Sequence, residues 1–255
     1  MRKGLRWLYL ILVVIFLYMP VFTLMVFSFN QGKTMARWSG FSFKWYKEMI
    51  SDQLIMGAIG NTLVIAIVSA AVATLIGTLG CIGLVKMKVK PRKVLLGLNN
   101  IPLLNADIVI GISLMMTFLA FGVTLSMGTV MFSHITFCIP YVILSVLPKF
   151  RELSPNIYEA ALDLGATPVY AFRKVVLPDI RPGIIAGFLL SFTMSVDDFV
   201  ITHFTRGAGV NTISTLIYSQ VKVGIRPTLF ALSTIIFIAV FVLLLVVNII
   251  SRRSN

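Results

Sequence analysis

The stretch IVIGISLMMTFLAFGVTLSMGTVMFSHITFCIPYVILSVLP, residues 108–148, contains 41 consecutive residues without an Asp, Glu, Lys or Arg. A helix that spans the hydrocarbon core of a bilayer needs roughly 20 apolar residues, because each residue rises about 1.5 Å. The stretch is therefore about twice as long as one span requires. Its middle, FGVTLSMG, contains Gly122 and Gly128, which favour a turn. We predict two membrane spans here, joined near these glycines.

Other long uncharged stretches lie on both sides of this one, at residues 7–32, 53–85 and 227–251, and each predicts one span. A sixth span is expected between Gly183 and Phe204. The composition agrees, because a chain that is 58% hydrophobic and 12% charged falls outside the range of soluble domains. We predict one all-α transmembrane domain over residues 1–255. The expected spans are residues 8–29, 57–85, 103–121, 127–148, 183–204 and 228–250.

The basic residues predict the orientation of these spans, since Lys and Arg are retained in cytoplasmic loops. One side of the predicted membrane holds 15 of the 22 Lys and Arg residues, in the segments 1–6, 86–93, 149–182 and 252–253. Both termini are therefore expected in the cytoplasm. The net charge of +13 follows the pattern that orientation requires, so we interpret it as contact with anionic lipid and not as nucleic-acid binding.

The longest cytoplasmic loop, residues 149–182, contains the start and stop signals of two short helices. Ser154–Pro155 can begin the first helix, and Gly165 can end it. Thr167–Pro168 repeats the start signal, and the second helix is expected to end just before Pro178. From these signals alone, the pair is either a docking element for a cytoplasmic partner or a loop packed on its own bundle.

The same loop carries a spaced motif: a Glu-Ala-Ala triplet, a glycine four residues on, and then an aliphatic residue, any residue and Leu-Pro. Its members are Glu159, Ala160, Ala161, Gly165, Val175, Leu177 and Pro178. This motif resembles the signature of ABC importer permeases, with Val175 where that family often has Ile. The segments FKWYKEMI, NADIVIGISLMM, FSHITFCIPYVI and SFTMSVDDFVITHF also resemble the permeases of bacterial spermidine/putrescine ABC importers.

This resemblance implies a type I ABC importer permease fold in the bacterial inner membrane, with the two short helices as coupling helices between spans four and five. Glu159, Ala160, Ala161, Gly165, Leu177 and Pro178 would form the element that docks an ATPase. The chain itself would be non-catalytic and without a cofactor. The implied partners are a second permease, two ATPase subunits that bind ATP and Mg, and a periplasmic or extracellular polyamine-binding protein. The alternative is a self-contained carrier or channel for organic cations, which has no reason to possess the motif.

Three carboxylates within the predicted spans favour a cationic substrate independently of the resemblance. A charge at the bilayer centre costs roughly 2.5–3.5 kcal/mol on insertion scales and is usually kept for a cavity or a partner. Asp107 is expected near mid-membrane, and Asp197 and Asp198 nearer the outer face. Adjacent helical residues point about 100° apart, so one of this pair can face the path while the other is hydrogen-bonded elsewhere. The alternative is that these carboxylates pair internally for assembly.

His134 follows Ser133 within the fourth predicted span, a pair that could suggest an intramembrane hydrolase. Adjacent helical residues diverge, however, and no oxyanion signature accompanies them. We therefore expect His134 to be packed or hydrogen-bonded within the bundle. Cys81 and Cys138 also lie in predicted spans, so we expect neither a disulfide nor a metal site.

A strip of small side chains spaced by four residues occupies the second predicted span. Its members are Ser69, Ala73, Gly77 and Cys81. Such a strip allows two helices in lipid to approach closely. It faces either another span of this chain or a partner permease, and the sequence leaves both possibilities open.

Overall fold

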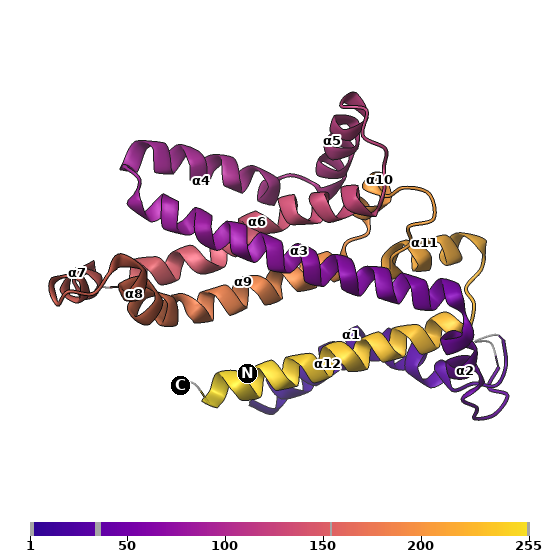
Figure 1. Ribbon diagram of the computed structural model, residues 1–255. Helices are drawn as coiled ribbons and strands as arrows, with labels where there is room; N and C mark the ends of the chain where they lie inside the picture. Colours follow the sequence, from indigo (N-terminus) through magenta and orange to yellow (C-terminus); the bar gives the residue numbers. More distant parts are fainter. Residues whose placement is uncertain (1–2, 34–36, 154, 254–255) are drawn as a thin grey trace. The chain divides into compact units, whose positions relative to one another are not determined.

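A computed structural model describes residues 3–33, 37–153 and 155–253, and these residues are almost entirely helical (Figure 1). The elements are α1 (Lys3–Ser28), α2 (Lys44–Ser51), α3 (Gln53–Lys86), α4 (Val89–Leu104), α5 (Asp107–Ala120), α6 (Met127–Glu152), α7 (Pro155–Asp163), α8 (Pro168–Ala171), the π-helical turn η1 (Phe172–Val176), α9 (Leu177–Asp197), α10 (Val200–Thr205), α11 (Ile213–Val223) and α12 (Thr228–Arg253). The chain forms two compact units, one of Met1–Met56 with Leu216–Asn255 and one of Gly57–Thr215.

The first unit joins the two ends of the chain, with α12 packed along α1 and against α2. The connection between α1 and α2 is tied down by polar contacts. The indole Nε1 of Trp45 donates to the Asn30 carbonyl at 2.6 Å, and the Ser28 and Tyr46 hydroxyls lie 2.7 Å apart. Trp45 is buried, so this unit has its own small core.

The second unit is built around α6, which packs along α9 and against α3, α5 and α10. Cys138, Val142 and Val146 of α6 are fully buried in its core. The α9 face toward α6 carries small residues at a spacing of four, and a Cβ added to Gly187 would lie 3.3 Å from the Val142 Cα. Small side chains thus let the two helix backbones approach closely.

The small-residue strip on α3 faces α6 of the same chain, which settles the alternative that the sequence left open. The Ser69 hydroxyl donates to the Met131 carbonyl at 3.3 Å. Farther along α3, a Cβ added to Gly77 would lie 2.7 Å from Cγ1 of Val142. Ala73 and Cys81 belong to the same core. The strip is therefore used for packing within this chain.

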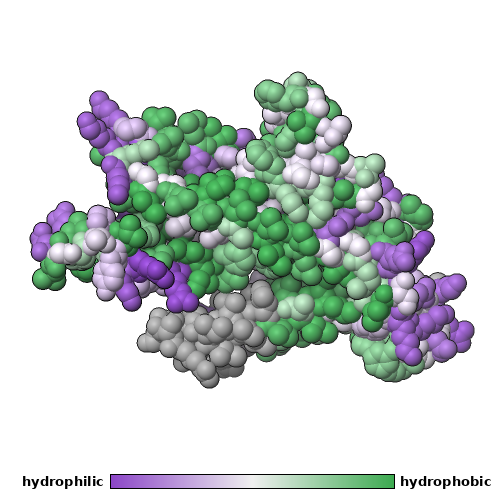
Figure 2. Space-filling view, in the orientation of Figure 1, coloured by the Kyte–Doolittle hydropathy of each residue, from purple (hydrophilic) through white to green (hydrophobic). Residues whose placement is uncertain are grey.

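Four helices are long and apolar enough to cross a membrane, counted over the residues that the structure describes: Arg6–Ser28, Gln53–Lys86, Met127–Glu152 and Pro168–Asp197. The bent pair α4–α5 would make a fifth, and α12 contributes a shorter apolar helix, Thr228–Val242. The count of six spans stays a prediction. Figure 2 shows hydrophobic residues over the middle of the second unit and hydrophilic ones around α7 and α8.

The predicted break inside residues 108–148 is confirmed, with α5 ending at Ala120, Gly122 at φ +68° and α6 beginning at Met127. Gly128 lies inside α6 and is not part of the turn. The prediction of one continuous span over residues 103–121 is wrong, because α4 and α5 meet at 107° around residues 105–106. Asp107 in the first turn of α5 favours a helix start there, since a negative charge stabilises a helix N-terminus by about 0.3–1 kcal/mol.

The prediction of one helix over residues 183–204 is also wrong. Helix α9 ends at Asp197, Asp198 has extended backbone angles (φ −64°, ψ 126°), and α10 begins at Val200. Asp197 and Asp198 are therefore not successive residues of one helix, and the 100° argument does not apply to them. The physical reason is the Asp198 carboxylate, which accepts hydrogen bonds from backbone N–H groups of α10 and so begins a new helix.

Candidate functional site

The first candidate site is the turn that ends α7. Gly165 has φ +85°, a conformation that costs little only for glycine. Its N–H donates to the Leu162 carbonyl at 2.9 Å, and the Ala166 N–H donates to the Ala161 carbonyl at 3.1 Å. These two bonds form a Schellman motif, which satisfies carbonyls that the end of a helix leaves without partners. The helix stop predicted at Gly165 is confirmed, while Ser154, the predicted start, lies outside the described residues.

The second short helix begins as predicted but does not end before Pro178. The Thr167 hydroxyl accepts from the Tyr170 N–H at 3.4 Å and caps α8. The chain then continues through η1 into α9, with the Leu177 N–H donating to the Phe172 carbonyl five residues back. An α-helical Pro178 would crowd the carbonyl of Lys174, and the wider π-helical turn relieves that crowding. The membrane helix α9 is thus continuous with the predicted coupling segment.

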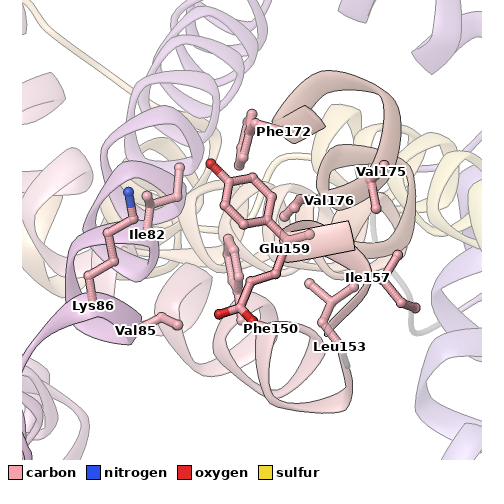
Figure 3. A pocket seen from close by; sticks show the side chains of 11 residues that line it. Ile82, Val85, Lys86, Phe150, Leu153, Ile157, Glu159, Phe172, Val175 and Val176 are labelled. Atoms are coloured by element: carbon pink, nitrogen blue, oxygen red, sulfur yellow. The ribbon is translucent and has the colours of Figure 1, made fainter. Parts of the chain in front are cut away.

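The α7–α8 turn exposes two large apolar side chains. Leu164, next to Gly165, is 89% exposed, and Val169 in α8 is 77% exposed. Behind α7, a cavity of about 290 Å³ is lined mostly by apolar side chains from α3, α6, α7 and η1 (Figure 3). Lys86 and Glu159 also line it. Glu159 and Ala160 are exposed and Ala161 is half-buried, so the motif residues remain accessible on one side of α7.

The second candidate site gathers all three carboxylates that the sequence singled out. Asp107, Asp197 and Asp198 line one cavity of about 190 Å³ together with apolar side chains, among them Phe137 and Phe199. Asp107 is the first residue of α5, Asp197 is the last of α9, and Asp198 lies in the bend before α10. Residues far apart in the sequence are thus brought together where three helices begin or end.

A glycine lets α5 approach α10 closely enough to bring Asp107 to this cavity. A Cβ added to Gly111 would lie 3.2 Å from the Phe204 ring and 3.4 Å from the Ile201 Cα. Gly111 is buried in this contact. The acidic cavity therefore depends on the packing of α5 against α10, and the carboxylates in the described part of the chain are not arranged as a metal site.

The three carboxylates differ in how far the protein satisfies them. Asp198 accepts hydrogen bonds from the Ile201 N–H at 3.1 Å and from the Thr202 N–H and hydroxyl, both at 2.8 Å. Its side chain is only 6% exposed. Asp107 and Asp197 are exposed, and no donor within the described ranges hydrogen-bonds to either carboxylate. Two of the three negative charges are therefore available to a ligand in the cavity.

His134 is a buried, hydrogen-bonded residue of α6, as predicted. Its Nδ1 lies 2.6 Å from the Ser195 hydroxyl, and its Nε2 lies 2.9 Å from the Thr202 hydroxyl and 3.3 Å from Oδ2 of Asp198. Sequence reasoning missed Ser195 and Thr202. A signal was present, because Asp198 precedes Thr202 by four residues, a spacing that suits a carboxylate accepting from the first turn of a helix.

Comparisons with known proteins establish the family and the fold of this chain. Residues 74–255 match the family described as binding-protein-dependent transport system inner membrane component, and the chain belongs to that family. The match confirms the expected ABC importer permease class, and with the long apolar helices it makes the chain a multi-pass inner-membrane protein and not an enzyme.

Three relatives are named as permeases of polyamine transport systems. The spermidine/putrescine transport system permease protein PotC of Escherichia coli (strain K12) is 35% identical over 94% of this chain and 91% of its own length. The putrescine transport system permease protein PotI of the same organism is 38% identical over 94% of this chain and 88% of its own length. PotC of Haemophilus influenzae is 33% identical over 100% of this chain and 99% of its own length.

Solved structures show the same fold. A bacterial ABC transporter involved in the import of the acidic polysaccharide alginate matches with a TM-score of 0.74 and 15% identity, covering 98% of this chain and 95% of that one. The same kind of transporter in complex with an alginate pentasaccharide-bound periplasmic protein matches with a TM-score of 0.75 and 20% identity, covering 98% and 93%. At these identities the likeness establishes the architecture alone, and it confirms the expected importer permease fold.

Proposed function

We propose that this chain is the membrane-spanning permease subunit of an ATP-driven polyamine importer. The acidic cavity forms part of the translocation path, and the α7–α8 turn docks an ATPase subunit. The proposal rests on three carboxylates gathered in one cavity, two of which accept no hydrogen bond from the residues that the structure describes. The relatives named as spermidine/putrescine and putrescine permeases support the same substrate class.

The chemistry of the cavity suits a chain of ammonium groups joined by methylene segments. Such a substrate must exchange water for fixed negative charge when it enters an apolar bundle. Asp107 and Asp197 supply that charge, while Phe137 and Phe199 give the cavity apolar lining for the methylene segments. Each contact is weak on its own, as release requires, since a path that binds its cargo tightly cannot conduct it.

The α7–α8 turn suits a protein partner. Exposed apolar side chains beside a turn closed by two backbone hydrogen bonds favour burial against another surface. In the proposed assembly, Glu159, Ala160, Ala161 and Gly165 contact an ATPase, and Leu177 and Pro178 continue the segment into α9. The proposed complex contains a second permease, two ATPase subunits that bind ATP and Mg, and a periplasmic or extracellular polyamine-binding protein, and both termini of this chain lie in the cytoplasm.

The test compares Asp107→Asn, Asp197→Asn and Asp198→Asn, since Asn removes the charge but keeps the shape. Polyamine uptake in cells and the membrane level of the assembled complex are measured for each variant. We expect Asp107→Asn and Asp197→Asn to lower uptake on the order of tenfold at normal complex levels, a loss of about 1.4 kcal/mol. We expect Asp198→Asn to deplete the complex. Uptake that falls only in proportion to complex abundance in all three would assign the carboxylates to assembly.

A second measurement separates an importer subunit from a self-contained cation carrier. Purification in mild detergent should bring an ATPase subunit with this chain, because the turn is proposed to bind it. A chain that purifies without an ATPase subunit, and that still transports polyamines in vesicles under an ion gradient, would favour the carrier.

A further inference from the structure

His134, a side chain of a third helix, contacts both sides of the bend between α9 and α10. The Ser214 hydroxyl also donates to the Asp198 carbonyl in the bend, at 2.7 Å. We infer that His134 is a positioning residue of the acidic cavity: it ties both sides of the bend to α6, which keeps Asp198 bound to α10 and leaves Asp197 facing the cavity. The inference rests on the proposed function, because it assigns the roles of the two carboxylates within that site.

The geometry places His134 across the break in the helix. Ser195, two residues before the end of α9, contacts Nδ1, and Thr202, in the middle of α10, contacts Nε2. The imidazole is 1% exposed, so water does not compete for these contacts. Because Asp198 is extended, the helical hydrogen-bond ladder does not continue through the bend. Side-chain contacts therefore have to set its angle.

The hydroxyl of Thr202 determines the direction of these hydrogen bonds. Its single proton is donated to Oδ2 of Asp198 at 2.8 Å, so the contact with His134 must be donated by Nε2. In the neutral imidazole, Nδ1 then accepts from the Ser195 hydroxyl. Donors thus run from His134 through Thr202 to the carboxylate, and the Ser195 hydroxyl contacts the other ring nitrogen. Hydrogen bonds in such a chain polarise and strengthen one another.

The result is a carboxylate whose accepting capacity is used within the protein. Oδ1 of Asp198 accepts from the Ile201 N–H, and Oδ2 accepts from two groups of Thr202 and faces the His134 Nε2 at 3.3 Å. Two carboxylate oxygens offer about four acceptor sites, so little remains for an ammonium group. Asp198 serves the fold of the bend, and Asp197, one residue earlier, is directed to the substrate.

Two substitutions at one position divide the contacts of the imidazole. In His134→Gln, the amide nitrogen reaches the position of Nε2, so the donor toward Thr202 and Asp198 is kept. In His134→Asn, the shorter amide reaches only the position of Nδ1, so Ser195 keeps a partner and Asp198 loses its donor. The pair is matched, since both residues are neutral amides in the same buried site.

The experiment measures hydrogen–deuterium exchange at residues 198–206 in the assembled transport complex, together with polyamine uptake per complex. We expect His134→Asn to speed exchange at the Ile201 and Thr202 amides about tenfold or more and to lower uptake several-fold. We expect His134→Gln to stay near the parent protein in both. Thr202→Val, which replaces the hydroxyl with a methyl group, should speed exchange at the same amides, and unchanged exchange in it overturns the inference if His134→Asn does not assemble.

Three outcomes would overturn the inference: unchanged exchange at these amides in His134→Asn, faster exchange with full uptake per complex, or equal depletion of the complex by both amide variants. The exchange result is independent of the transport assignment. Full uptake by Asp197→Asn would remove the proposed path while leaving the anchoring of the bend to be judged by exchange alone.

Discussion

Gly165 gives the sharpest test of the proposed ATPase dock, because the cost of replacing it can be read from the structure. Its φ is +85°, and no heavy atom lies within 4 Å of the position where a Cβ would stand. An added Cβ therefore meets no clash, and the cost that the structure shows comes from the backbone. For an L-residue that cost is about 1–2 kcal/mol, or roughly 5- to 30-fold in the population of the turn.

The informative comparison is Gly165→Val with Gly165→Asn. Valine is β-branched and disfavours positive φ strongly, whereas Asn adopts this conformation more readily. We expect Gly165→Val to lower both the ATPase that copurifies with the complex and polyamine uptake, by up to the same 5- to 30-fold. Gly165→Asn should stay within about twofold of the parent protein. Membrane levels of the chain, measured by immunoblot, control for insertion.

A Gly165→Val variant that inserts normally, copurifies with the ATPase and transports as well as Gly165→Asn would refute this reasoning. The Schellman turn would then be a local helix end with no part in docking. Because no atom lies near the added Cβ, overpacking would not explain a reduced membrane insertion of Gly165→Val.

Two further predictions concern packing and activity. Gly77→Ala and Gly80→Ala both gain about 1 kcal/mol of helix propensity. A Cβ at Gly77 would lie 2.7 Å from Val142, and such overpacking costs about 1–3 kcal/mol. A Cβ at Gly80 meets no such crowding, because its nearest atom, in Ile143, lies at 3.8 Å. Gly77→Ala should lower and Gly80→Ala should raise the melting temperature of the purified complex, and equal shifts would contradict the α3–α6 packing. The purified chain alone should hydrolyse no ATP, whereas the full complex with binding protein should show polyamine-stimulated ATP hydrolysis. Contaminant-free hydrolysis of ATP by the chain alone would contradict the family assignment.

Local signals in the sequence were enough for features that depend on one or two neighbouring residues. The turn near Gly122 and the helix end at Gly165 both need positive φ, and glycine announces that requirement directly. Long uncharged stretches likewise located the apolar helices, because the thickness of the bilayer fixes the length of a span.

The bends at residues 105–106 and 198–199 were not predicted, because hydropathy counts apolar residues and carries no information about the hydrogen-bond partners of each carboxylate. Asp198 begins a helix only because its oxygens find the amides of α10 and the side chain of His134, 64 residues earlier. Pro178 misled for a similar reason, since a proline can follow a π-helical turn without ending the helix. Nor could spacing alone show that the α3 strip packs on α6.

The π-helical turn η1 affects how α7 and α8, on one side of it, are oriented relative to α9, on the other. A turn of this kind holds about one more residue than an α-helical turn. It therefore rotates the helices on its cytoplasmic side, α7 and α8, by roughly 100° about the axis of α9. The face of α9 that packs on α6 and the face that α7 and α8 present to the proposed ATPase subunit are therefore set independently. Deleting a single residue between Phe172 and Val176 would leave α9 packed as it is and rotate the cytoplasmic helices by about a quarter of a revolution. A one-residue change in length would thus change which side of α7 and α8 faces the proposed ATPase subunit, without altering the helix that carries Asp197.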